Sequence, residues 1–233
     1  MSFKEFSKTV MVSMEDICRD IFHANKGTIK VKKEAVGVRN LINIYDATLR
    51  LSNRKGFHAM SLRDLARESG LSLGALYSYF SSKDQLLGII QEQGYRMTTK
   101  MLSDEIKKAS DPAEKLEVAV RTHLYLSEAM QPWFYFFYME ARHLDKEEQK
   151  KAIASELYTE QLFVSILDDG IKQGCFRPHD TVMVASVIKA MLQDWYLKRW
   201  KYSRRKVTVD DYAGFVTGFI GAYVNSPGKA MPS

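Results

Sequence analysis

The sequence has little of what builds disulfide scaffolds, zinc sites or membrane spans. Its 233 residues include only two cysteines, Cys18 and Cys175, which lie far apart and form no CxxC pair. Neither a disulfide framework nor a zinc site is expected, and this cysteine usage is typical of a reducing cytosol. No apolar run approaches about 18 residues and no secretory leader is recognisable, so the sequence predicts a cytoplasmic protein with no membrane partner.

The sequence also has few prolines and lacks the alternation of apolar and polar residues that is typical of strands. The chain has five prolines and no period-two alternation long enough for a strand. Because strand patterns are missing and helix start and stop signals recur along the sequence, we predict an all-α chain with about nine or ten helices. Apolar residues make up 45% of the chain, which is enough for a sizeable core.

Motifs for catalysis and cofactor binding are also missing. Glu140 and His143 have the i, i+3 spacing of half a di-iron site in a helical bundle, but no second pair occurs. No Gly-rich phosphate loop or nucleophile motif is present. We therefore expect no enzyme, no cofactor and no metal. A helical-bundle metalloenzyme is the alternative from another class, and a metal assay would identify it.

What the sequence does contain is a helix-turn-helix pattern. Ser61 lies three residues before Asp64, which is the spacing of a capping box at the start of a helix. Gly70 lies where a left-handed residue ends that helix, and Ser72 lies where a side chain caps the next one. The outward face of the second helix is small, polar and flanked by tyrosine, which suits a recognition helix in a major groove.

In these residues the chain resembles the tetracycline-repressor-like (TetR/AcrR) regulators. The resemblance runs from Val38 to Leu87 and is carried by the segments GF (56–57), SLRDLA (61–66), GLS (70–72) and GALYSYFSSK (74–83). It implies an all-α fold, with an N-terminal helix-turn-helix three-helix DNA-binding domain followed by a larger helical ligand-binding and dimerisation domain. The expected divisions are an extension at 1–35, the DNA-binding domain at 36–84, the second domain at 85–226 and a disordered tail at 227–233.

The resemblance also implies roles for single residues. Tyr77, Tyr79 and Lys83 would hold phosphates, although the position of Tyr79 is often histidine in the family. Arg63 has the donor fork that pairs with guanine, and the start of the second helix would face bases. The residues expected to contact DNA are Arg63, Ser72, Leu73, Gly74, Ala75, Tyr77, Ser78, Tyr79 and Lys83.

The charge distribution agrees with a DNA-binding N-terminal end. Residues 1–84 hold 14 Lys or Arg against 9 Asp or Glu, whereas residues 85–233 hold 20 against 19. Phosphate binding would require such a basic excess, although ordinary solvated surfaces also carry one. In the linker before the first domain helix, Lys30, Lys32 and Lys33 are candidates for auxiliary phosphate contacts. A solvated linker explains them equally well.

The N-terminal extension and the exit from the DNA-binding domain are both expected to be helical. Apolar residues at near-helical spacing predict an amphipathic helix within residues 1–25, for which packing on the same protein is the expected role. A continuous helix from Lys83 to about Ala109 would connect the DNA-binding domain with the second one.

An aromatic segment in the second domain predicts an effector cavity. Residues 133–138 are all aromatic, and large rings with a few polar anchors are typical of ligand pockets, although such rings also pack ordinary cores. A lining of this kind favours a large apolar or planar molecule. Basic residues between 198 and 206 make an acyl-CoA one candidate, although charge runs are usually solvated. The residues expected to bind the effector are Tyr125, Trp133, Phe137, Glu140, Arg142, His143 and Trp195.

The last two expected helices predict a homodimer. Residues 209–224 contain several small residues beside Phe215 and Phe219. A helix surface of this kind allows another helix to approach closely. Helix-turn-helix proteins bind palindromic operators in double-stranded DNA as twofold dimers. We therefore expect a repressor released from its operator by a small apolar or aromatic effector, for which an acyl-CoA or other hydrophobic acid is a candidate. A constitutive DNA-binding protein without effector is the closer alternative.

Overall fold

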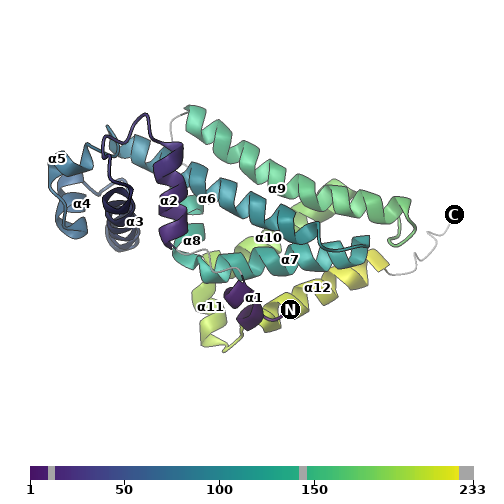
Figure 1. Cartoon of the computed structure of the whole chain (residues 1–233). Helices are drawn as coiled ribbons and strands as arrows, with labels where there is room; N and C mark the ends of the chain where they lie inside the picture. The colour runs from purple at the N-terminus through teal and green to yellow at the C-terminus, as the bar shows by residue number, and fades with distance from the viewer. Residues whose placement is uncertain (10–13, 142–145, 226–233) are drawn as a thin grey trace. The chain divides into compact units, whose positions relative to one another are not determined.

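The computed structural model describes residues 1–9, 14–141 and 146–225 (Figure 1). This part of the chain contains twelve helices and no strand, which confirms the all-α class. In chain order the helices are α1 (Phe3–Thr9), α2 (Met14–Ala24), α3 (Glu34–Lys55), α4 (Leu62–Ser69), α5 (Leu73–Leu76), α6 (Lys83–Ile106), α7 (Pro112–Ala129), α8 (Gln131–Glu140), α9 (Lys146–Lys172), α10 (Thr181–Leu197), α11 (Arg199–Arg204) and α12 (Val209–Asn225). Among the described residues, no helix is both long enough and apolar enough to cross a membrane.

The chain forms two compact units that are not simple halves of the sequence. Unit 1 comprises Met1–Thr9, Met97–Gln131 and Ile153–Ser233, and unit 2 comprises Val10–Arg96 and Pro132–Ala152. The α6 and α9 helices therefore contribute residues to both units. The functional boundary expected between residues 84 and 85 stays a prediction.

Unit 2 is built around α3, the first helix of the expected DNA-binding domain. On α3, Ile44 and Ala47 are fully buried. The α2 helix packs on α3 so closely that a Cβ at Gly37 would lie 2.2 Å from Cε2 of Phe22. A larger residue at position 37 would force the two helices apart, so this close approach requires glycine. The second helix of the extension is thus part of the core of unit 2.

Unit 1 is a bundle in which α7 packs on α10 and α12. Each of these helices begins at a cap that the sequence predicts. Oδ1 of Asp111 accepts from the backbone N–H of Ala113 at 2.9 Å, and Oδ1 of Asp180 accepts from that of Met183 at 2.9 Å. Oγ1 of Thr208 accepts from the backbone N–H of Asp211 at 3.1 Å. These bonds satisfy N–H groups that have no partner within their own helix.

Candidate nucleic-acid interface

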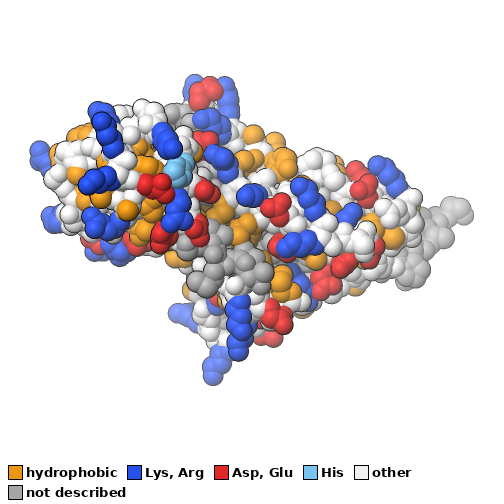
Figure 2. Space-filling view, in the orientation of Figure 1, with side chains coloured by type: hydrophobic (Ala, Val, Ile, Leu, Met, Phe, Trp, Pro, Cys, Tyr) orange, Lys and Arg blue, Asp and Glu red, His pale blue; other side chains and the backbone are white. Residues whose placement is uncertain are grey.

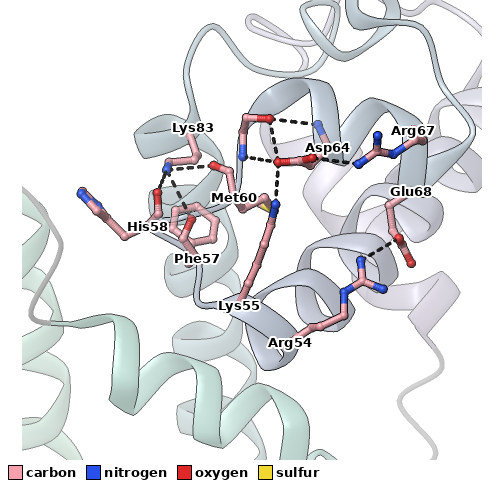
Figure 3. Close-up of polar contacts among 10 residues, drawn as sticks. Arg54, Lys55, Phe57, His58, Met60, Asp64, Arg67, Glu68 and Lys83 are labelled. Carbon is pink, nitrogen blue, oxygen red and sulfur yellow. Dashed lines mark hydrogen bonds and ion pairs between the residues drawn. The ribbon is translucent and has the colours of Figure 1, made fainter.

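The first helix of the helix-turn-helix, α4, is fixed at both ends. The backbone N–H of Asp64 donates to Oγ of Ser61 at 3.1 Å, and that of Ser61 donates to Oδ2 of Asp64 at 3.0 Å, which confirms the capping box. The same carboxylate accepts from Nζ of Lys55 at 2.6 Å (Figure 3). Hydrogen bonds from Lys55 and Ser61 hold the pKa of Asp64 well below its usual range. At the other end, Gly70 has a left-handed φ of 72°, as expected.

The second helix, α5, is shorter than expected. Its start is as predicted, because Oγ of Ser72 accepts from the backbone N–H of Ala75 at 3.1 Å. The helix ends after Leu76, and tighter turns follow in which the N–H of Ser78 donates to the carbonyl of Ala75 at 3.0 Å. Leu76 and Phe80 are buried on the inner side.

Most of the residues expected to face DNA lie on the opposite, accessible side. Arg63, Ser72 and Gly74 are exposed, and Tyr77 keeps 46% of its surface accessible. A Cβ added at Gly74 would meet no atom within 4 Å, so the space in front of α5 is open. Leu73, Ala75 and Ser78 are half-buried beside them. This arrangement leaves room for a duplex, and the individual contacts stay predictions.

Tyr79 does not have the accessible position expected of a phosphate contact. Its side chain is only 1% exposed, and its hydroxyl oxygen is buried. This burial raises the pKa of Tyr79. Because a phosphate cannot reach a covered hydroxyl, the expected role of Tyr79 is wrong for this structure, and its ring contributes to the core beneath α5.

The ammonium group of Lys83 also makes its contacts within the protein. Nζ donates to the carbonyls of Phe57, His58 and Met60 at 3.2, 2.8 and 3.1 Å, and lies 5.3 Å from the centre of the Phe57 ring (Figure 3). An ammonium group has three donors, and all three have acceptors here. The structure therefore assigns Lys83 to holding the loop between α3 and α4, in place of the expected phosphate contact.

Three residues expected to bind an effector pack against other helices of unit 2. Trp133 on α8 lies against Tyr45 of α3, with ring centres 5.6 Å apart. A Cβ at Gly94 on α6 would lie 1.9 Å from Cζ of Phe137, so that ring fills the space left by the glycine. Both α8 side chains belong to unit 2. In this structure they are packing residues of the helix-turn-helix support.

Glu140, the third of these residues, is a buried carboxylate at the end of α8. Its Oε1 accepts from the backbone N–H of Phe57 at 3.3 Å. The α3–α4 loop is thus held from α6 by Lys83 and from α8 by Glu140. Sequence reasoning missed this contact, although a carboxylate at the end of an aromatic helix needs a donor if it is buried.

The other expected effector residues fall outside unit 2 or outside the described residues. Tyr125 and Trp195 lie in unit 1, where the Tyr125 hydroxyl donates to Oδ1 of Asp210 at 2.6 Å and Nε1 of Trp195 donates to Glu128 at 3.0 Å. Arg142 and His143 lie outside the described residues. Among the cavities of the described part of the chain, one of about 120 Å³ and one of about 180 Å³ are lined by other residues than the expected effector residues. The predicted effector site stays a prediction.

A basic segment that the sequence left ambiguous lies beside the end of α5. The backbone N–H of Lys30 donates to the carbonyl of Ser78 at 2.8 Å, which attaches the linker to the helix-turn-helix. Lys30, Lys32 and Lys33 are all exposed. On the face drawn in Figure 2, Lys and Arg side chains gather over the region of α3 to α5. A positive surface of this kind suits the phosphates of a duplex.

The chain is similar to known transcriptional regulators along most of its length. A family model described as bacterial regulatory proteins, tetR family, matches residues 44–90, and one described as tetracyclin repressor-like, C-terminal domain, matches residues 109–217. The HTH-type transcriptional repressor KstR2 of Rhodococcus jostii is 28% identical over 174 residues, which cover 73% of this chain and 83% of that protein.

Solved structures of such regulators share the fold. PfmR, a TetR family transcriptional regulator from Thermus thermophilus, matches with a TM-score of 0.65 at 25% identity, covering 77% of this chain and 95% of that one. AibR in complex with isovaleryl coenzyme A and operator DNA matches with a TM-score of 0.68 at 20% identity, covering 80% and 98%. Within the described residues, no group of three or more His, Cys, Asp or Glu side chains is arranged to hold a metal ion.

Proposed function

The chain belongs to the TetR family of DNA-binding transcriptional regulators and is not an enzyme, and on that premise we propose that it is a cytoplasmic repressor released from its operator by an apolar effector. The observation that carries the proposal is the outward face of α5. That face combines a small-residue surface with open space in front of Gly74 and an exposed tyrosine beside it.

The DNA contacts divide into those that read bases and those that hold the backbone. Exposed Arg63 and the start of α5 face base edges, and the Arg63 guanidinium pairs with guanine O6 and N7. The hydroxyl of Tyr77 and the ammonium groups of Lys30, Lys32 and Lys33 contact phosphates. These cations replace Lys83 in that role, because its three donors are already used.

The partner for symmetric DNA binding is a second copy of this chain, held through α10 and α12. On α12, Phe215 is 69% and Phe219 is 54% exposed, and Gly214 and Gly218, which directly precede them, are exposed as well. On α10, Met183 and other apolar side chains are also exposed. Exposed apolar surface of this extent is typical of an interaction site. Small residues allow close contact between paired helices, and a twofold pair matches a palindromic operator.

The effector class is an apolar acid carried as a coenzyme A thioester. AibR, a neighbour of the same fold, has a crystal structure in complex with isovaleryl coenzyme A and operator DNA. In this chain, α11 and the turn after it carry exposed Arg204, Arg205 and Lys206 beside an exposed Trp200. Cations next to an indole ring offer partners for phosphates and for a purine ring.

Effector binding would weaken DNA binding through the α3–α4 loop. Lys83 from α6 and Glu140 from α8 both hold this loop, and α6 continues without interruption to Ile106. A ligand that favours another position of α6 or α8 would move the loop and the helix-turn-helix with it. The loss of DNA affinity equals the preference of the ligand for that second state.

The test uses the full chain and a random duplex library. Repeated selection should enrich a sequence with twofold symmetry. A panel of acyl-CoA thioesters of increasing chain length, with free coenzyme A as the matched control, should then raise the dissociation constant of that duplex. Failure to enrich any duplex would refute the proposed function. Enrichment without a response to any thioester would identify a regulator without this effector.

A further inference from the structure

A small polar cavity lies between the C-terminal end of α2 and the middle of α6, within unit 2 (Figure 1). Its volume is about 120 Å³, which is the space of roughly four water molecules at about 30 Å³ each. Ile21 of α2 and Ile89 of α6 form an apolar wall, and most of the other lining residues are polar. The N-terminal extension therefore supplies one side of this cavity.

Two opposite charges line this cavity without pairing with each other. Glu92 and Arg96 lie four residues apart on α6, and neither forms an ion pair with any described residue. Opposite charges at this spacing on a helix ordinarily gain from pairing. Elsewhere in the chain the same spacing gives an ion pair of 2.7 Å between Glu117 and Arg121. Both charged groups at the cavity are thus available to a ligand.

Two amide side chains complete the polar lining. Gln93 is only 8% exposed, and its carboxamide forms no hydrogen bond to any described residue. A buried amide without a partner is costly unless water or a ligand satisfies it. Nδ2 of Asn25 donates to the carbonyl of Ile21 at 2.9 Å, which leaves Oδ1 of Asn25 as an acceptor at the cavity. The cavity therefore offers both donors and acceptors beside its two charges.

From this lining we propose that the cavity binds a small zwitterionic α-amino acid with a short aliphatic side chain. The ammonium group of the ligand donates to the Glu92 carboxylate and to Oδ1 of Asn25. Its carboxylate accepts from the Arg96 guanidinium and from Nε2 of Gln93. The aliphatic side chain packs on the isoleucines of the apolar wall, and a molecule the size of L-alanine matches the volume.

A ligand with a single charge is a poorer fit for this site. A carboxylic acid leaves the Glu92 carboxylate without a cation, and an amine leaves the Arg96 guanidinium without an anion. The site goes beyond the proposed function, because neither operator DNA nor the acyl-CoA effector takes part in it.

The first experiment measures binding of L-alanine to the full chain by isothermal titration calorimetry. Propionate and ethylamine are the matched controls, because each lacks one of the two charged groups of L-alanine. L-alanine should bind at millimolar concentration or below, and each control should bind about tenfold more weakly or worse, since each loses charged hydrogen bonds. No binding of L-alanine, glycine or L-valine would overturn the inference, and so would propionate or ethylamine binding as tightly as L-alanine.

The second experiment locates the ligand with variants of the full chain. Glu92→Gln and Arg96→Gln each remove one charge and should weaken L-alanine binding by about tenfold or more. Asp84→Asn and Lys100→Gln are matched controls, because both residues are exposed on α6 outside the cavity lining, and these variants should bind as the unmodified chain does. Ala24→Leu keeps every charge but fills part of the cavity from an exposed position, so it should also lose binding.

L-alanine binding that survives the two charge removals and Ala24→Leu would place the ligand elsewhere and overturn the inference. None of these measurements contains DNA or a thioester. A failure of the amino-acid site therefore leaves the proposed function standing, and a failure to enrich a duplex leaves the amino-acid site standing.

Discussion

Replacing Lys83 with methionine separates the structural role of this lysine from a DNA-contacting one. Methionine keeps an unbranched apolar chain of similar length but removes the ammonium group. The three carbonyls of Phe57, His58 and Met60 then lose their shared donor in the α3–α4 loop. The loop would be held from α8 alone, through Glu140.

The expected cost follows from the geometry of these bonds. A hydrogen bond to a charged group contributes about 1.5 to 3 kcal/mol, but such bonds to a single group are not additive. Lys83 is half-buried, so water can partly replace it at the carbonyls. We therefore expect Lys83→Met to lower the free energy of unfolding by about 2 kcal/mol, which is roughly a 4 to 8 °C lower unfolding temperature for a protein of this size.

The assay combines thermal unfolding with the salt dependence of duplex binding. Each phosphate contact contributes about 0.9 to the slope of log K against log salt concentration. Lys83→Met should therefore be less stable and keep the slope of the unmodified chain between about 50 and 200 mM salt. The matched control is Lys32→Met in the exposed linker, which should keep its stability and lose about 1.8 of the slope, about 0.9 for each of the two copies on the duplex. A reduced slope in Lys83→Met with unchanged stability would refute the reasoning.

Three further predictions test other parts of the account. Glu140→Ala should destabilise the chain by about 1 to 3 kcal/mol in urea unfolding, because the buried N–H of Phe57 loses its acceptor, whereas Glu140→Gln should cost less. Gly218→Leu fills open space in the single chain, so sedimentation should show folded monomers if α12 forms the dimer interface and unchanged dimers if it does not. Burial alone would raise the pKa of Asp194, but hydrogen bonds from Lys198, Lys201 and Tyr202 outweigh it and lower this pKa to about 2. The stabilisation from this carboxylate is therefore complete above about pH 4 and is lost as the pH falls toward 2, a pH dependence of unfolding that Asp194→Asn should lack.

Sequence reasoning was most successful where the signal is local. Helix starts at Ser61, Asp111 and Asp180 depend on a side chain and an N–H two or three residues away, so four residues encode the whole contact. The end of α4 at Gly70 is local in the same way, because it depends on one residue with a left-handed backbone conformation.

Sequence reasoning failed where the partner of a side chain is distant in the chain. The aromatic residues of α8 could line a pocket or pack a core, and periodicity does not say against what a ring packs. Trp133 packs on α3, and Phe137 packs on α6. For Lys83, the composition of the motif gives the charge but not the direction of the side chain, which is set by carbonyls more than twenty residues earlier in the chain.

The central claim is that two copies of α5 enter successive major grooves of one duplex. Interference by methylation at guanine N7 tests it most directly, because that atom lies in the major groove. On the duplex selected by the full chain, the account predicts two patches of interference related by twofold symmetry and separated by a whole number of helical turns, about 34 to 36 Å each. A single patch, or tight binding without any interference in the major groove, would contradict it.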